Sequence, residues 1–108
     1  MSWDAYIYTI VDGKEVEIHE GWNYTHNCNG MLRTAGFEEW PYDVKSMRGT
    51  TFAEKLSKTV EQMEKEPGEY RKMDPKNGWG SYDTLLPILK DMLEVARQYP
   101  SAFWEVHG

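Results

Sequence analysis

Cysteine is nearly absent from this chain, because Cys28 is the only one among its 108 residues. A single thiol cannot form an internal disulfide, so we expect a reducing compartment and a cytoplasmic location. The first residues, Met1 to Asp4, lack the charged and apolar segments of a secretory signal peptide. No apolar run approaches the roughly 20 residues that a membrane-spanning helix requires, so no membrane association is expected.

Basic clusters are missing as well. The chain has 18 acidic and 12 basic residues, a formal net charge of −6, and no run of Lys or Arg. Phosphate contacts require clustered basic side chains, so we expect neither nucleic-acid binding nor docking on an anionic membrane. An acidic surface is compatible with a basic protein partner, although most acidic domains are simply soluble.

Catalytic signatures are also lacking, since no GxSxG, P-loop, HExxH or GxGxxG pattern occurs. His26 and Cys28 offer two metal-ligand types, but no second pair follows at ligand spacing, so we expect no metal and no cofactor. The same two residues are unsuited to a nucleophilic pair, because side chains so close in sequence rarely reach the required geometry. The sequence therefore favours a binding protein over an enzyme.

Aromatic residues, by contrast, are abundant, with five Trp and seven Tyr. Tyr and Trp fill cores, and they also supply binding faces because each combines a large rigid ring with a polar tip. The chain length is typical of one domain, so residues 1–108 are expected to form a single globular unit with one core.

A β-hairpin is the clearest local prediction. Residues 3–11 are rich in β-branched and aromatic types, residues 14–20 alternate, and Asp12-Gly13 between them favours a two-residue turn. This turn pairs Val11 with Lys14 and, at the far end, Trp3 with Trp22. One face then carries the apolar side chains that we expect in the core: Trp3, Ala5, Ile7, Val16, Ile18 and Trp22.

The opposite face of this hairpin mixes aromatic and charged residues. Tyr6 and Tyr8 lie there beside Glu15 and Glu17. In one interpretation the charged side chains cover the tyrosines on a solvated sheet. In the other, the Tyr6/Tyr8 face is an interface, either for a homodimer or for another protein, because exposed aromatic patches mark interaction sites.

Three helices follow in the sequence. Thr25 or Asn27 would cap a short helix over residues 25–35. A capping box at 51–54 begins a second helix, whose apolar residues recur at helical spacing. The third helix is predicted from 81–83 to about residue 98.

An ordered loop over 36–49 and a last strand over 101–107 complete the order β-β-α-α-α-β. This order predicts an α+β fold, a two-layer sandwich in which helices cover one face of a three-stranded antiparallel sheet. The first strand is apolar on both sides, so it should lie centrally, with the last strand as its other neighbour.

Two polar-aromatic segments, residues 21–30 and 77–83, are candidates for a ligand site. The first supplies amides, hydroxyls and an imidazole that can bind a polar ligand, from Asn23, Tyr24, Thr25, His26 and Asn27. The second places a tryptophan between two glycines, where the indole can serve as a stacking platform, and contributes Asn77, Trp79, Tyr82 and Asp83.

Ordinary structural roles compete with this hypothesis. Asn and Thr commonly form turns and caps, Trp79 could anchor its loop in the core, and Asp83 could cap a helix. Both segments, however, precede a predicted helix. If the two helix starts lie together, one pocket would be lined by Tyr24, His26, Asn27, Trp79, Tyr82 and Asp83.

The same segments carry a resemblance to a protein family. The chain begins Met-Ser-Trp-Asp, has Asn-Tyr-Thr-x-Asn at 23–27, and has Asn-Gly-Trp-Gly-x-Tyr-Asp at 77–83 before a leucine-rich helix. In these features it resembles a family of small uncharacterised proteins of actinobacteria and their bacteriophages. The resemblance implies a cytoplasmic setting, in a phage-infected host, and no catalytic role. Some members carry a CxxC-like insertion between the first strands, where this chain has Asp12-Gly13, so no metal is expected there.

Three functions from different classes remain open. The first is a non-enzymatic binding module that takes a small polar or nucleotide-like ligand between the two segments. The second is an acidic interaction or inhibitor module, acting as a homodimer or on a host protein. The third is a small hydrolase-type enzyme in which Asp83 orients His26 as general base.

Overall fold

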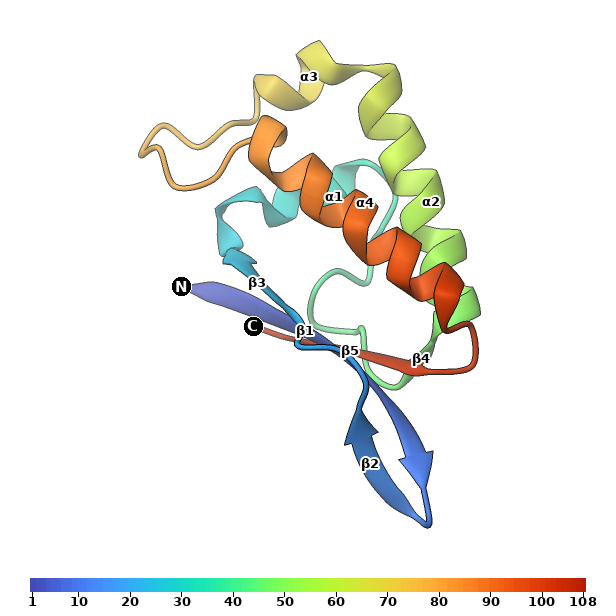
Figure 1. The fold of residues 1–108 in the computed structure, drawn as a ribbon. Coiled ribbons are helices and arrows are strands. Elements are labelled where there is room, and N and C mark those ends of the chain that lie inside the picture. The colour runs from blue at the N-terminus through green and yellow to red at the C-terminus, as the bar shows by residue number, and fades with distance from the viewer.

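The computed structural model describes residues 1–108 as an antiparallel sheet with helices packed on one of its faces (Figure 1). β1 (Ser2–Val11) is the central strand. On one side it pairs with β2 (Lys14–Glu17) and β3 (Trp22–Thr25), and on the other with β5 (Phe103–His107), which in turn pairs with β4 (Met47–Arg48). The predicted α+β class, and the central position of the first strand beside the last, are confirmed.

The sheet has five strands, so the predicted three-stranded two-layer sandwich does not match in detail. The predicted second strand, residues 14–20, ends at Glu17 as β2, and a separate strand, β3, begins at Trp22 after the segment between them. Gly21 there has a φ of +86°, and a Cβ at this position would lie 2.6 Å from the carbonyl oxygen of Ala5. The fifth strand, β4, lies inside the predicted 36–49 loop.

This interruption shifts the strand register. The Asp12-Gly13 turn forms as predicted and pairs Val11 with Lys14. Beyond the interruption, however, Trp3 pairs with Tyr24 instead of Trp22. The prediction at the far end of the hairpin is therefore wrong by two residues, which are absorbed between β2 and β3.

The outer half of the hairpin projects past the helices (Figure 1). Val16 is consequently 43% exposed and does not join the core, in contrast to its predicted place there. Trp3, Ala5 and Ile7 are buried as predicted, because their part of β1 lies beneath the helical layer.

Two long antiparallel helices cover the sheet: α2 (Gly49–Lys65) and α4 (Tyr82–Gln98). The predicted capping box at the start of α2 does not form, because the helix begins at Gly49 and Thr51 lies inside it. Its first backbone N–H groups are satisfied instead by the segment before β5. Gly49 donates to the carbonyl of Ala102 at 2.7 Å, and Thr50 donates to that of Pro100 at 3.0 Å.

Three shorter helical segments position the loops: η1 (His26–Cys28), α1 (Asn29–Thr34) and α3 (Pro67–Arg71). Thr25 caps η1 as predicted, because its side chain accepts a hydrogen bond from the Asn27 N–H. Ser81 caps α4, so the predicted start and end of the third helix are confirmed. None of the helices combines the length and apolar character that a bilayer crossing requires.

The core lies between the sheet and the two long helices. Trp104 of β5 stacks on Phe52 of α2 with ring centroids 4.1 Å apart, and Trp3 of β1 meets Trp40 edge to face. All four rings are fully or almost fully buried. Many of the aromatic side chains therefore pack in the core, and the exposed ones are candidates for a binding surface.

Candidate functional site

The two polar-aromatic segments lie side by side, although Tyr24 and Ser81 are separated by 57 positions in the sequence. The hydroxyl of Tyr24 on β3 accepts a hydrogen bond from the Ser81 N–H at 2.9 Å and lies 2.7 Å from the Thr84 hydroxyl. Asn27 of η1 donates from its amide to the carbonyl oxygen of Trp79 at 3.3 Å. The loop before α4 is therefore joined to the end of β3 (Figure 1).

Gly80 makes this close approach possible. Its φ of +92° is in the region that favours glycine, and a Cβ there would lie 2.6 Å from Thr25 Cγ2 and 3.0 Å from Cys28 Sγ. Any larger residue would push the loop away from η1. Glycine is therefore required at position 80 both by the positive φ and by the close contact with Thr25 and Cys28.

An open cavity of about 600 Å³ lies where the segments meet. It is lined by Met1, Ser2, Asn23, Thr25, Asn27, Asn77 and Trp79. Five of the nine residues proposed from the sequence therefore line one cavity: Asn23, Thr25, Asn27, Asn77 and Trp79. Trp79 is 69% exposed, so the indole is not a core anchor.

Hydrogen bonds hold the cavity's asparagines in place. Asn23 donates to Asp4 Oδ1 at 2.9 Å and to Ser2 Oγ at 3.1 Å. Asn77 accepts from the backbone N–H of Trp79 at 2.9 Å, which forms a tight turn beneath the indole. In each of these two side-chain amides, one polar atom is therefore bonded to the protein and the other has no protein partner.

Tyr24 supports the cavity from behind and does not line it. Its ring lies 6.0 Å from that of Trp3, and its hydroxyl is engaged by Ser81 and Thr84. Burial raises the pKa of the Tyr24 hydroxyl above its ordinary value, and burial likewise raises the pKa of the neighbouring Cys28 thiol. Both groups are neutral at pH 7, so neither is an activated nucleophile.

The other three proposed residues lie outside the cavity, and the hydrogen bond between His26 and Asp83 that the enzyme alternative requires does not form. His26 lies edge-on to Tyr42, and its Nε2 is buried without a partner. Asp83 forms an ion pair with Arg71 at 2.9 Å. Tyr82 is buried and donates its hydroxyl to the carbonyl of Met63 at 3.0 Å.

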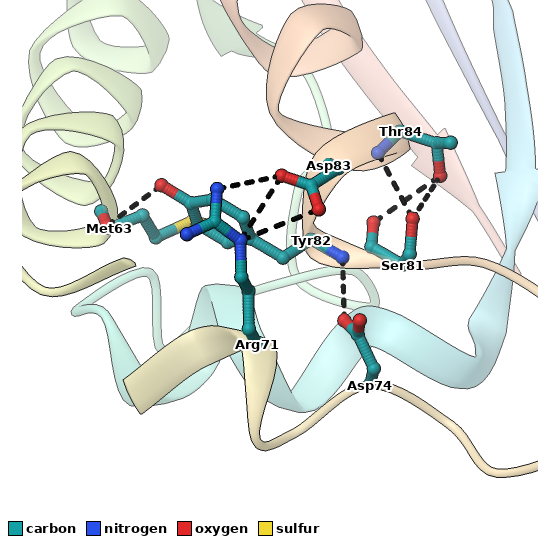
Figure 2. Close-up of polar contacts among 7 residues, drawn as sticks. All are labelled: Met63, Arg71, Asp74, Ser81, Tyr82, Asp83 and Thr84. Atoms are coloured by element: carbon teal, nitrogen blue, oxygen red, sulfur yellow. Dashed lines mark hydrogen bonds and ion pairs between the residues drawn. The ribbon is translucent and has the colours of Figure 1, made fainter. Parts of the chain in front are cut away.

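Figure 2 shows these contacts at the start of α4. Asp74 accepts the N–H of Tyr82 at 2.7 Å, and Ser81 Oγ accepts that of Thr84 at 3.1 Å. Arg71 holds Asp83 from α3. The contacts fix both ends of the loop that carries Trp79, because Asp74 precedes the loop and Ser81 follows it.

Four residues in or around the cavity were not predicted from the sequence: Met1, Ser2, Arg71 and Asp74. Ser2 and Met1 line the cavity because Ser2 pairs with Thr25 across β1 and β3. The predicted hairpin already brought the first residues beside Asn23, and this was the available signal. Asp74 and Arg71 carried no comparable signal, since their partners are chosen by the tertiary packing of α3 on α4.

The Tyr6/Tyr8 face is partly covered by the chain itself. Tyr8 is only 5% exposed, stacks on Phe103 at 5.4 Å and shares a 2.9 Å hydrogen bond with Ser46. The exposed apolar side chains nearby belong to the hairpin tip instead: Ile10 (48%), Val11 (51%) and Val16 (43%).

No group of three or more His, Cys, Asp or Glu side chains gathers in a way that could hold a metal ion. Comparison of the chain with protein-family models, curated proteins and solved structures gave no match.

Proposed function

We propose that this chain is a non-enzymatic binding module that takes a small polar or nucleotide-like ligand in the cavity between β3 and the Trp79 loop. The main support for this proposal is that the indole of Trp79 is largely exposed and lines a polar cavity of about 600 Å³. Cavities of roughly 300–1,000 Å³ are the usual size for small-molecule ligands. A ring that stacks on Trp79 would cover apolar surface that the fold leaves in water.

The cavity is organised before any ligand enters. Asp74 and Ser81 fix the ends of the loop, and Asn77 fixes the turn beneath Trp79. Side chains that are already ordered lose less entropy on binding, which improves affinity without adding contacts. These hydrogen bonds support the proposal because they hold the loop in one conformation before a ligand binds.

The cellular location and the origin that we propose are inferred from the sequence. The single cysteine favours the cytoplasm, and the resemblance to phage-encoded proteins favours a bacteriophage origin. In an infected cell a module of this kind would act by withholding its ligand from host proteins.

Mass spectrometry of small molecules released from the purified protein tests the proposal. We expect the wild-type protein and Tyr99→Ala, which removes an exposed ring away from the cavity, to carry the same compound. Trp79→Ala should carry at least about fivefold less, because base–aromatic stacking contributes roughly 1–3 kcal/mol. A wild-type protein that carries no compound, or a compound that survives Trp79→Ala undiminished, would contradict the proposal.

A second candidate is a protein-interaction module, acting as a homodimer or on a host protein. The exposed apolar residues at the hairpin tip favour it, because Ile10, Val11 and Val16 lie beyond the core. Antiparallel pairing of two copies along β2 would place Glu15 and Glu17 opposite one another, and such like charges are destabilising. A basic partner therefore fits this edge better than a second copy does, and light scattering of the pure protein distinguishes monomer from dimer.

A further inference from the structure

The edge of the sheet formed by β2 has no neighbouring strand. β2 pairs with β1 on one side only, and all four of its residues are exposed. Ile18, which directly follows β2, donates its N–H to the carbonyl of Ile7 at 3.1 Å. Backbone groups alternate in direction along an antiparallel strand, so the N–H and C=O groups of Glu15 and Glu17 point away from β1. Unpaired groups of this kind can bind a further strand.

The two faces of this edge differ in chemistry. Glu17 pairs with Tyr8, and Tyr8 follows Ile7, which is buried beneath the helices. Side chains alternate along a strand, so Glu17 and Glu15 lie on the face of the sheet that carries no helices. Val16 points to the opposite face and is 43% exposed, because the hairpin projects past the helices (Figure 1). An added strand would therefore meet a carboxylate, an apolar side chain and a second carboxylate in turn.

A small acidic cavity lies beside Glu17, where the chain breaks between β2 and β3. It has a volume of about 300 Å³ and is lined by Asp4, Ala5, Tyr6, Glu17, Glu20, Gly21, Trp22 and Asn23. Three of these residues are acidic, and none is basic. Burial raises the pKa of the Tyr6 hydroxyl, and the negative charges of Glu105 and Glu15 raise it further. The cavity therefore favours a cation, which the face of an aromatic ring also attracts.

The basic residues of the sheet do not neutralise this edge. Lys14 lies on the opposite face from Glu15, since the two are adjacent along β2. Arg48 belongs to β4, at the other edge of the sheet, and His107 belongs to β5, on the far side of β1. The helix-free side of the β2 edge is therefore negatively charged, and it complements a partner that carries positive charge.

We propose that β2 binds an extended segment of a basic partner protein, which adds a strand to the sheet. Basic side chains at two alternate positions of this segment lie opposite Glu15 and Glu17, and an apolar side chain between them lies beside Val16. A third basic side chain, two residues further along, enters the acidic cavity. The inference rests on the protein-interaction candidate of the proposed function and is independent of the Trp79 cavity.

The test uses a peptide with capped ends and the sequence Lys-Val-Lys-Val-Lys, whose binding to the full chain is followed by NMR. We expect the backbone N–H signals of Glu15 and Glu17 to shift, with a Kd below about 1 mM, and their hydrogen exchange to slow. The N–H of Val16 already points to β1, so its exchange should change less. The peptide Lys-Lys-Lys-Val-Val has the same composition and controls for general charge attraction. It should bind at least about fivefold more weakly.

Three variants separate the contribution of charge from that of the backbone. Glu17→Gln removes one carboxylate and should weaken peptide binding about threefold. Glu17→Pro removes the same charge and also the outward N–H, so its binding should be about fivefold weaker still. The fold tolerates a proline here, because at a free edge the lost N–H bonds to no strand. Glu61→Gln removes an exposed carboxylate on α2 and should leave the Kd unchanged.

Several outcomes would overturn the inference. Equal binding of the two peptides, or shifts that leave out Glu15 and Glu17, would show that no strand is added. Equal binding by Glu17→Pro and Glu17→Gln would exclude backbone pairing. If neither peptide binds but light scattering shows a dimer, the partner is a second copy, and only this inference is lost. Trp79→Ala should bind the peptide as the wild type does, so the ligand cavity is tested separately.

Discussion

Tyr24 connects the two segments that meet at the cavity. Its hydroxyl, on β3, bonds to Ser81 and Thr84 at the start of α4. Tyr24→Phe leaves the Ser81 N–H without its acceptor, so we expect a loss of about 1–3 kcal/mol in the free energy of unfolding. Urea denaturation measures this loss. Tyr70→Phe is the control, since Tyr70 is a buried tyrosine whose hydroxyl bonds to no protein group. Equal losses in the two variants would show that the Tyr24 hydroxyl does not join the segments.

Gly78 and Gly80 flank Trp79. Alanine substitutions at these two positions distinguish the cost of a positive φ from the cost of a steric clash. Both have positive φ values, +92° and +76°, but only Gly80 meets neighbouring atoms at its Cβ position. Gly78→Ala should cost about 1–2 kcal/mol, the usual penalty of a left-handed alanine. Gly80→Ala should cost more, because its methyl group would strike Thr25 and displace the loop.

Thermal unfolding of these two glycine variants checks the difference, and NMR of the Trp79 indole reports the loop. A Gly80→Ala variant as stable as Gly78→Ala, with an unmoved indole signal, would mean that the loop does not pack on η1.

At this scale the sequence identified most of the cavity but not the direction of every side chain. Trp79 could be found because an isolated indole between two glycines is unusual in a structural turn, and Asn27 because its segment, like that of Trp79, precedes a predicted helix. Asp83 was misplaced because it sits one residue after the buried Tyr82, and α3 supplies Arg71 as its partner. A choice of partner between distant elements is tertiary information that local pattern does not contain.

Among the elements, α2 is held to the preceding turns by an ion pair between Lys55 and Glu39. The hydrogen bond from Lys55 is the main reason that the pKa of Glu39 lies below its ordinary value. Because the folded-state pKa is lowered, the contribution to stability is present above the unfolded value, about 4.3. It is lost as the pH falls through the folded value.

We therefore expect Lys55→Met to lower the free energy of unfolding by less than about 1 kcal/mol at pH 7, because both groups are partly exposed. The difference from wild type should shrink below about pH 4. Urea titrations at pH 7 and pH 3 measure it. Lys58→Met, whose exposed pair with Glu54 spans 3.6 Å, is the control, and a pH-independent loss in Lys55→Met would contradict the assignment.

The elements themselves were largely predictable, and the exceptions have physical causes. The Asp12-Gly13 turn and the start of α4 formed as expected, since each depends on local backbone chemistry. The break at Gly21 and the strand β4 did not follow from local pattern. Gly21 fits against the backbone of β1, and β4 is a two-residue pairing with β5 that exists only when the sheet is assembled.

At the scale of the whole molecule, the sheet is divided into a covered half and a projecting hairpin. Ile7 lies beneath the helices and is fully buried, whereas Val16 on the neighbouring strand is 43% exposed. Ile7→Ala should cost about 2–5 kcal/mol through lost burial and a cavity. Val16→Ala should cost less than about 1 kcal/mol, because Val16 is already 43% exposed in the folded protein and gains less from burial.

Denaturant midpoints of these two variants measure the contrast. If Val16→Ala proved as costly as Ile7→Ala, the hairpin tip would be part of the core, and its exposed apolar surface would no longer favour a partner.

In the proposed function, Asn23, Thr25 and Asn27 form one ligand cavity together with the Trp79 loop. The most direct test compares NMR spectra of the protein as purified from cells and after its small molecules are removed by unfolding and refolding. We predict that the indole N–H of Trp79 and the side-chain amides of Asn27 and Asn77 shift together, while the indole signals of the buried Trp3 and Trp104 stay in place. Spectra that are identical before and after stripping, or changes confined to one segment, would contradict the claim.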